Sequence, residues 1–291
     1  MNILEILAKG DILMTDCAMG TTLIDLGLGL GECPETWCFE HAEDIAKLAK
    51  DCIDAGSNII TTNSFGANRF KFAHYGLEDV RNINIQAAKI ARSAADDSVF
   101  VAGSVGPTGK MLLMGDVTED EMYDAFKEQV TALHEGGADL ILIETMSDIE
   151  EAEIAVKAAK ERTPLPVAVT FAFDKTVKCE YRTMMGVSPA DMAQAMQNAG
   201  ADIIGANCGN GIENMVEITK EIRETAPNAF ILIQANAGMP KNVDGKDIFP
   251  ATAQEMSGKM GELIDSGANI IGGCCGTTPA HITAMKKAIL R

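Results

Sequence analysis

Two adjacent cysteines, Cys274 and Cys275, lie in the segment 272–279, where glycines flank them on both sides. Neighbouring side chains of a strand point to opposite faces, so both thiols can reach one ion only where the strand opens into a loop. Three interpretations are open: a strained disulfide between neighbours, two buried thiols, or part of a soft-metal site. A catalytic metal site needs at least one more ligand and an open coordination position.

The composition is that of a soluble globular protein with ample material for a core, since 47% of the residues are hydrophobic. The net charge of −18 disfavours nucleic acid and anionic membrane as partners. The amino terminus has no basic region followed by a long apolar run, and no apolar stretch approaches the ~20 residues of a membrane span. We therefore expect a cytoplasmic protein. Its eight cysteines lack the spacing of a disulfide scaffold, which favours reduced thiols.

One pattern, a glycine followed by an apolar run, recurs at residues 55–60, 136–141, 199–204 and 266–271. Glycine after a helix is the usual left-handed cap, and the apolar run that follows predicts a strand buried on both faces. Apolar residues at helical spacing predict the helices before these copies, at residues 43–55, 119–135, 189–198 and 253–265.

Four further strands are predicted between the copies, at residues 12–15, 99–103, 167–171 and 230–233, which makes eight in all. Helices also fit residues 80–95, 149–162, 213–224 and 279–290. Alternating strands and helices predict an α/β fold, a single-domain (β/α)8 TIM barrel over residues 1–291. Residues 1–10 would form a short helix, with the barrel starting at about residue 11. An open doubly wound sheet is the alternative, but it usually has five or six strands. The loops 27–41 and 106–118 are expected over the barrel mouth.

Barrel enzymes carry their active sites at the carboxyl ends of the strands. Cys208 follows the sixth predicted strand, whereas Cys274 and Cys275 follow the eighth. All three should open onto the same mouth, and three cysteines with one open position suit zinc. Three thiolates around a dication leave one net negative charge, which favours nucleophilic attack by a bound thiolate. The four histidines show no ligand spacing and are interpreted as structural or exposed.

Polar residues at other strand ends are candidates for holding a substrate. Asp16 and Glu144 could grip an ammonium group, although either could instead cap a helix. Asn63 and Ser104 end the second and third strands, and the amides of residues 103–106 could receive a carboxylate or simply shape a turn. Asn236 is a candidate for approaching the metal when substrate is absent, or for tying down its loop.

Seven segments together resemble the homocysteine S-methyltransferase family: residues 16–21, 62–67, 103–107, 144–145, 207–209, 236–238 and 272–279. The resemblance runs from about Asp11 to the carboxyl end. It implies a barrel that binds zinc through Cys208, Cys274 and Cys275, and in which Asp16 and Glu144 hold the amino acid end of homocysteine. It also implies that the nucleophile is the metal-bound homocysteine sulfur rather than a side chain, and that methionine is formed.

Within the family, the residues of these motifs most resemble those of the homocysteine-binding module of cobalamin-dependent methionine synthase, whose methyl donor is methylcobalamin. No aspartate stands two positions before a histidine, so the Asp-x-His-x-x-Gly signature of a cobalamin-binding domain is absent. The resemblance then implies a separate methylcorrinoid protein as donor. Other relatives use S-methylmethionine, S-adenosylmethionine or betaine, but no aromatic cage for betaine is evident. Cys17 departs from the family, in which glycine is usual, and places another thiol beside Asp16.

Two alternatives to this enzyme remain. The chain could be a non-catalytic subunit that binds a thiol or metal and docks onto a corrinoid partner, but Asp16 and Glu144 argue against that. It could also be a metabolic barrel whose cysteines are structural. The sequence does not determine the methyl donor, the thiol acceptor or the oligomeric state.

Overall fold

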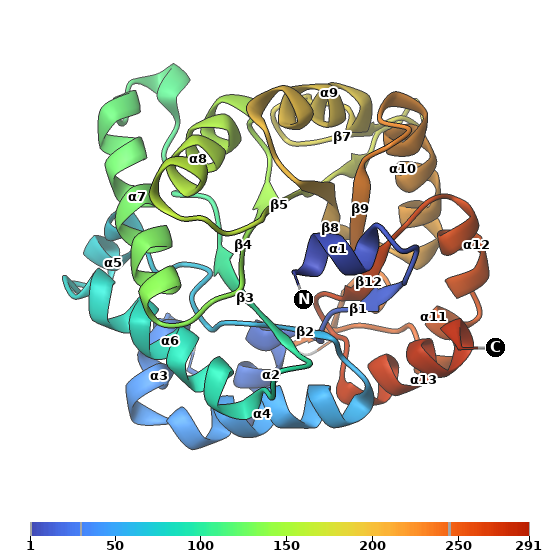
Figure 1. The fold of residues 1–291 in the computed structure, drawn as a ribbon, viewed down its shortest axis with the longest axis horizontal. Helices are drawn as coiled ribbons and strands as arrows, with labels where there is room; N and C mark the ends of the chain where they lie inside the picture. Colours follow the sequence, from blue (N-terminus) through green and yellow to red (C-terminus); the bar gives the residue numbers. More distant parts are fainter. Residues whose placement is uncertain (1, 30, 244–245, 291) are drawn as a thin grey trace.

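The computed structural model describes residues 2–29, 31–243 and 246–290. Eight parallel strands form one sheet in the order β1-β12-β9-β8-β5-β4-β3-β2, which curls into a ring (Figure 1). The strands are β1 (Leu13–Met14), β2 (Ile59–Thr61), β3 (Phe100–Val105), β4 (Leu140–Met146), β5 (Val167–Phe171), β8 (Ile203–Gly211), β9 (Phe230–Asn236) and β12 (Ile270–Gly273). Two short antiparallel pairs stand apart from this sheet: β6 (Asp174–Lys175) with β7 (Tyr181–Arg182), and β10 (Lys241–Val243) with β11 (Lys246–Ile248).

The ring closes between its first two strands. The backbone amide of Asn58, just before β2, donates to the carbonyl of Met14 in β1 over 2.7 Å. A second hydrogen bond joins the same two residues, from the backbone amide of Met14 to Oδ1 of the Asn58 side chain over 3.1 Å. The predicted (β/α)8 barrel is therefore confirmed.

The main helices surround the sheet: α4 (Ala42–Ala55), α6 (Val80–Ala94), α7 (Glu119–Glu135), α8 (Ile149–Arg162), α9 (Pro189–Ala199), α10 (Ile212–Thr225), α11 (Ala253–Ser257), α12 (Met260–Asp265) and α13 (Pro279–Ile289). The helix predicted over residues 253–265 is wrong in one respect, since it is divided into α11 and α12 at Gly258. Among the described residues, no helix is long and apolar enough to span a membrane.

The glycine of the repeated pattern ends the preceding helix in all four copies. Its φ is +112° at Gly56, +103° at Gly137, +88° at Gly200 and +108° at Gly267. Residues other than glycine adopt this left-handed backbone conformation only with strain, which is why the pattern carries glycine there.

The amino end of the barrel is covered by α1 (Ile3–Leu7), the short helix predicted from the sequence. Figure 1, which looks down the ring, shows α1 lying across it. Ile3 and Leu7 are buried in one cluster with residues from the strands, including Leu13, Leu140 and Leu232. A second, larger cluster fills the space between the sheet and the outer helices. The amino end is thus packed, so the carboxyl ends of the strands remain for a site.

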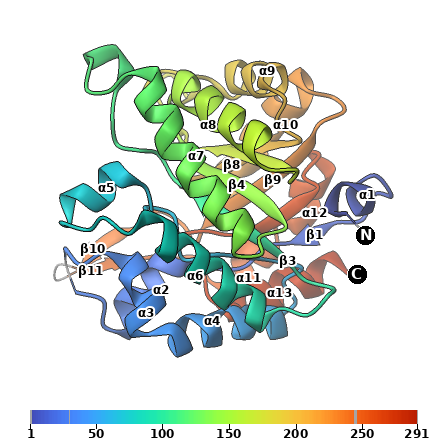
Figure 2. The same ribbon diagram turned by 60° about the vertical axis from the view of Figure 1, so that its left-hand side comes forward.

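The carboxyl ends carry the shorter elements: α2 (Met19–Leu26), the 3-10 helix η1 (Pro34–Thr36), α3 (Trp37–Glu40), α5 (Arg69–His74), η2 (Leu112–Met114), β6 (Asp174–Lys175), β7 (Tyr181–Arg182), β10 (Lys241–Val243) and β11 (Lys246–Ile248). Figure 2 shows α5 and the β10–β11 hairpin at the end of the molecule opposite α1. The sequence predicted neither hairpin.

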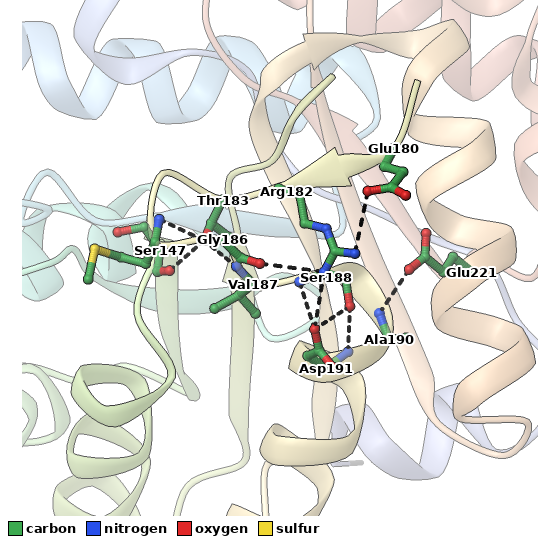
Figure 3. A network of polar contacts seen from close by, with 11 residues as sticks. Ser147, Glu180, Arg182, Thr183, Gly186, Val187, Ser188, Ala190, Asp191 and Glu221 are labelled. Carbon is green, nitrogen blue, oxygen red and sulfur yellow. Dashed lines mark hydrogen bonds and ion pairs between the residues drawn. The ribbon is translucent and has the colours of Figure 1, made fainter. Parts of the chain in front are cut away.

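The β6–β7 hairpin is fastened to the barrel rim by the polar network of Figure 3. The hydroxyl of Thr183 donates to the carbonyl of Ser147, directly after β4, over 2.7 Å. Arg182 forms ion pairs with Glu180 and with Asp191 of α9. Asp191 also accepts from the hydroxyl of Ser188 over 2.6 Å, completing the cap of α9. These bonds tie β7 to the end of β4, the strand that carries Glu144.

Candidate active site

Three cysteines meet at the carboxyl ends of β8 and β12, as predicted. Cys208 lies near the end of β8, and Cys274 and Cys275 directly follow β12. Their sulfur atoms all lie within 4.8 Å of one another, and those of Cys208 and Cys275 are 3.8 Å apart. All three residues are half-buried, so the cluster can hold a metal ion and leave one side open.

The backbone around the cysteines is bent so that the thiols converge. Cys208 has φ +58°, the left-handed conformation that favours glycine, which turns its side chain out of the β8 ladder. A Cβ on Gly273 would stand 2.1 Å from Oγ1 of Thr277. That hydroxyl donates to the carbonyl of Cys274 over 2.7 Å and accepts from the amide of Ala18. Glycine next to the cysteine pair is therefore a packing requirement.

The three thiols share negative charge unequally. Hydrogen bonds from Cys274 and Cys275 lower the pKa of Cys208 to about 3. The same contact with Cys208 raises the pKa of Cys275 to about 12 and raises that of Cys274 as well. Without a cation, the cluster therefore holds one thiolate and two thiols. A dication would compensate two of the three thiolate charges and leave one net negative charge, so the donor set fits a thiophilic metal.

Asp16 and Glu144 face the same cavity from β1 and β4. One carboxylate oxygen of Asp16 accepts from both the amide and the hydroxyl of Thr61, at 2.6 and 2.8 Å. Glu144 accepts from the hydroxyl of Ser104 over 2.5 Å and from Asn207 over 3.5 Å. Burial raises the pKa of Asp16 to about 6 and that of Glu144 to about 7. Neither carboxylate has a cationic side chain as partner among the residues that the structure describes, and an ammonium group would supply one.

Ser104 is held by a closed set of hydrogen bonds. Its amide donates to the hydroxyl of Thr62 over 2.9 Å, and its carbonyl accepts from the hydroxyl of Ser64 over 2.7 Å. The two hydroxyl oxygens are 2.6 Å apart. The amide of Gly106 is bonded as well, to the carbonyl of Phe65. The amides of Ser104 and Gly106 thus have partners within the protein, which weakens their expected use as a carboxylate site. The Ser104 hydroxyl reaches Glu144 instead.

Pro34 and Glu35, from the loop predicted over the mouth at residues 27–41, line one side of the cavity. Asn63 lines the cavity, but its amide donates to the carbonyl of Pro34 over 2.7 Å. Glu35 is buried and accepts from the amide of Gly66 over 2.5 Å. Asn63 therefore holds the segment around Pro34 in place. The loop 106–118 was expected over the mouth as well, yet none of its described residues lines the cavity.

The remaining candidates lie close to the cysteines and carboxylates. Asn236 is buried and donates a hydrogen bond to Cys208, while its Oδ1 has no partner among the described residues. Cys17 lines the cavity beside Asp16, and its sulfur lies 3.0 Å from that of Cys52 in α4. The cavity has a volume of about 370 Å³, and no histidine of the described chain lines it.

Sequence reasoning assigned no role to three residues of the site. Thr61 binds Asp16, Asn207 contacts Glu144, and Gln234 lines the cavity from β9 between the two cysteine-bearing strands. Each lies at or next to a strand end predicted from the sequence, so its place in the sequence could have indicated a role in the site. Thr61 bonds a residue 45 positions away, and Asn207 contacts one 63 positions away. Sequence spacing could not show either contact.

Comparison with known proteins points to one family. A family model described as homocysteine S-methyltransferase matches residues 13–289. Methionine synthase of Mycobacterium tuberculosis (strain ATCC 25618 / H37Rv) is 30% identical over 305 residues, covering 99% of the chain and 25% of that protein. Methionine synthase of Mycobacterium leprae (strain TN) is 28% identical over 309 residues, covering 100% and 25%. The chain thus spans about a quarter of the length of these relatives.

Solved structures share the fold over nearly the whole chain. The metallated form of the homocysteine methyltransferase MmuM from Escherichia coli superposes with a TM-score of 0.80 at 24% identity. The alignment covers 97% of this chain and 98% of that one. The oxidized form of the same protein gives a TM-score of 0.78 at 25% identity, covering 97% of each chain.

Proposed function

The chain belongs to the homocysteine S-methyltransferase family, and on that premise we propose that it transfers a methyl group to the sulfur of homocysteine, forming methionine. The observation that carries this proposal is the convergence in one cavity of three thiols and two carboxyls that have no cationic partner among the described residues. The thiols suit a metal that binds sulfur, and the carboxyls suit the ammonium of an amino acid. Homocysteine offers both groups at the two ends of a short chain.

Cys208, Cys274 and Cys275 would hold zinc, with the open side of the cluster toward the cavity. Zinc held there would lower the pKa of a bound thiol, so that the homocysteine sulfur is presented as a nucleophile at neutral pH. Asn236 supports this assignment, because its buried Oδ1 lacks a partner among the described residues and its amide already bonds Cys208. An amide oxygen at that position can approach a metal when no thiol occupies the open side.

Asp16 and Glu144 would bind the ammonium of homocysteine. Thr61 and Ser104 fix the two carboxylates from the side of the protein, so the ammonium only has to enter between them. Charge-assisted hydrogen bonds from an ammonium favour the ionised carboxylates and return their pKa values toward the usual range. The sulfur at the other end of the molecule would then point toward the cysteines. In the transfer, the sulfur lone pair forms the new bond to carbon, and the donor keeps the electron pair of the broken bond.

We propose a methylcorrinoid presented by a cobalamin-binding partner as the donor, since the motifs resemble those of a module that takes its methyl group from cobalamin. Exposed apolar side chains around the mouth support a macromolecular partner. Of thirteen exposed large apolar side chains among the described residues, twelve lie on segments that connect a strand end to the next main helix. They are Ile24, Leu26, Phe39, Tyr75, Met111, Leu113, Met114, Val177, Met184, Met239, Val243 and Ile248.

The test combines metal analysis with a panel of donors. The wild-type protein and Cys208→Ala are compared for zinc content, with Cys179→Ser as control, because Cys179 is an exposed cysteine remote from the cluster in sequence. Methionine formation is then followed with methylcobalamin, S-methylmethionine and S-adenosylmethionine. We expect about one zinc per chain, lost only in Cys208→Ala, and turnover with methylcobalamin.

Absence of zinc, or of any methylated thiol, would overturn the enzyme assignment. Turnover only with a sulfonium donor would retain the methyltransferase and reject the corrinoid. Homocysteine-dependent change at the zinc without turnover under any donor would instead identify a thiol-binding subunit of a corrinoid system.

A further inference from the structure

Two cysteines outside the metal cluster form a close pair. The sulfur of Cys17 lies 3.0 Å from that of Cys52, although the two residues are 35 positions apart in the chain. Cys17 follows Asp16 at the end of β1, and Cys52 lies in the last turn of α4. Both side chains are buried, with exposures of 5% and 1%. Cys17 nevertheless forms part of the cavity wall, so a small molecule in the cavity can reach it.

We propose that Cys17 and Cys52 are a redox modification site, which hydrogen peroxide entering through the cavity converts into a disulfide that weakens substrate binding at Asp16. The modification itself follows from the placement of the two thiols. Its effect on homocysteine rests on the proposed function.

The reaction balances with one peroxide per disulfide. The sulfur of Cys17 attacks one peroxide oxygen, the O–O bond breaks, and a sulfenic acid and one water form. The sulfur of Cys52 then attacks the sulfenic sulfur and the S–O bond breaks. The hydroxyl leaves with the proton of the Cys52 thiol as a second water. The contact with Cys52, and then burial, raise the pKa of Cys17, so its thiolate is scarce at neutral pH. Oxidation should therefore be slow at pH 7 and faster as the pH rises.

The disulfide would disturb Asp16 through the backbone. A sulfur–sulfur bond is about 2.05 Å long, whereas the two sulfurs now lie 3.0 Å apart. Bond formation must bring the two sulfurs closer by roughly 1 Å, and we infer that Cys17 and α4 move toward one another as it does so. Asp16 is the adjacent residue, and its carboxylate is held in place by two short bonds to Thr61. A misplacement of about 1 Å can reduce a reaction rate about 100-fold, so we expect homocysteine binding at Asp16 to weaken by about tenfold or more.

The experiment uses the zinc-loaded full chain with and without hydrogen peroxide. Remaining thiols are alkylated, and the protein is digested without reduction. Cleavage at Lys47 and Lys50 separates the two cysteines, and cleavage after Glu32 separates Cys17 from Cys33 and Cys38. The linked peptide is detected by mass, and zinc is measured in the same sample. Homocysteine binding is titrated before and after oxidation, and again after reduction with a phosphine.

We expect a linked Cys17–Cys52 peptide, unchanged zinc, and homocysteine binding weakened about tenfold or more and restored by the phosphine. Cys52→Ala should form no linked peptide and keep its homocysteine affinity under the same exposure. Absence of the linked peptide after peroxide treatment would overturn the modification site. Equal loss of affinity in Cys52→Ala, or a linked peptide with unchanged affinity, would overturn the coupling to Asp16. The peptide readout is independent of whether homocysteine is the substrate.

Discussion

Replacing Ser104 by alanine should weaken homocysteine binding in a pH-dependent manner. The Ser104 hydroxyl donates to Glu144 over 2.5 Å and lowers the pKa of that carboxyl, which burial raises to about 7. Hydrogen bonds to charged groups contribute about 1.5–3 kcal/mol. Removing this one should shift Glu144 further toward its neutral form, which cannot pair with the ammonium of the substrate.

The size of the effect can be worked from a loss just below that range, equal to one pKa unit. A loss of about 1.4 kcal/mol lowers the ratio of ionised to neutral Glu144 roughly tenfold at fixed pH. At pH 7 the wild-type residue is about half ionised, and the variant would be about one tenth ionised. Apparent affinity scales with the population of the competent form. The dissociation constant should therefore rise about ninefold at pH 6, about fivefold at pH 7 and about twofold at pH 8.

The assay is calorimetric titration of homocysteine into the zinc-loaded protein at these three pH values, which needs no methyl donor. Ser93→Ala is the matched control, because the Ser93 hydroxyl bonds a backbone carbonyl within α6 instead of lining the cavity. The reasoning is refuted if the ratio of variant to wild-type dissociation constants is the same at pH 6 and pH 8. Such a constant ratio would mean that Ser104 contacts the substrate directly.

Three further predictions concern the same region. Folding raises the pKa of Glu144 to about 7, so wild-type stability falls as pH rises through 7. In urea unfolding of the metal-free proteins, Glu144→Gln should be more stable than the wild type by up to about 3 kcal/mol at pH 8. The two proteins should be nearly equal in stability at pH 5. A Cβ at Gly272 would stand 1.6 Å from the Thr15 hydroxyl oxygen, so Gly272→Ala should lose more than about 2 kcal/mol, whereas the control Gly261→Ala, with open space around it, should not. Thr62→Val leaves the Ser104 amide without its acceptor and should raise the KM for homocysteine severalfold; Thr62→Ser should restore it, and failure to do so would contradict a hydroxyl role.

Regular elements were predictable because each carries its own local signal. The repeated glycine followed by an apolar run located strands β2, β4, β8 and β12 within a residue or two of their observed starts. Helix α7 was predicted over its observed span. Short excursions were not predictable in the same way. The β6–β7 hairpin depends on Thr183 and Arg182 bonding distant residues, and isolated two-residue strands leave no periodic pattern to read.

The candidate site was predictable to the extent that position on a strand end implies position on the mouth. That rule brought Cys208 to Cys274 and Cys275, and Asp16 and Glu144 to one cavity. It could not assign partners to side chains. Asn63 donates to the covering segment, and the Ser104 amide bonds Thr62, because the ends of β2 and β3 are close enough for their hydroxyl and amide groups to pair.

The sequence by itself determined the barrel, the reactive rim and the family, because periodicity and glycine placement act over a few residues and the barrel then puts every strand end on one face. Only the tertiary structure decided which groups are charged and which are paired. Burial makes Asp16 and Glu144 weaker acids, three sulfurs share the negative charge at the cluster, and Cys17 meets Cys52 across 35 positions. These properties depend on distances between segments far apart in the chain and on exclusion of water, which the order of residues does not contain.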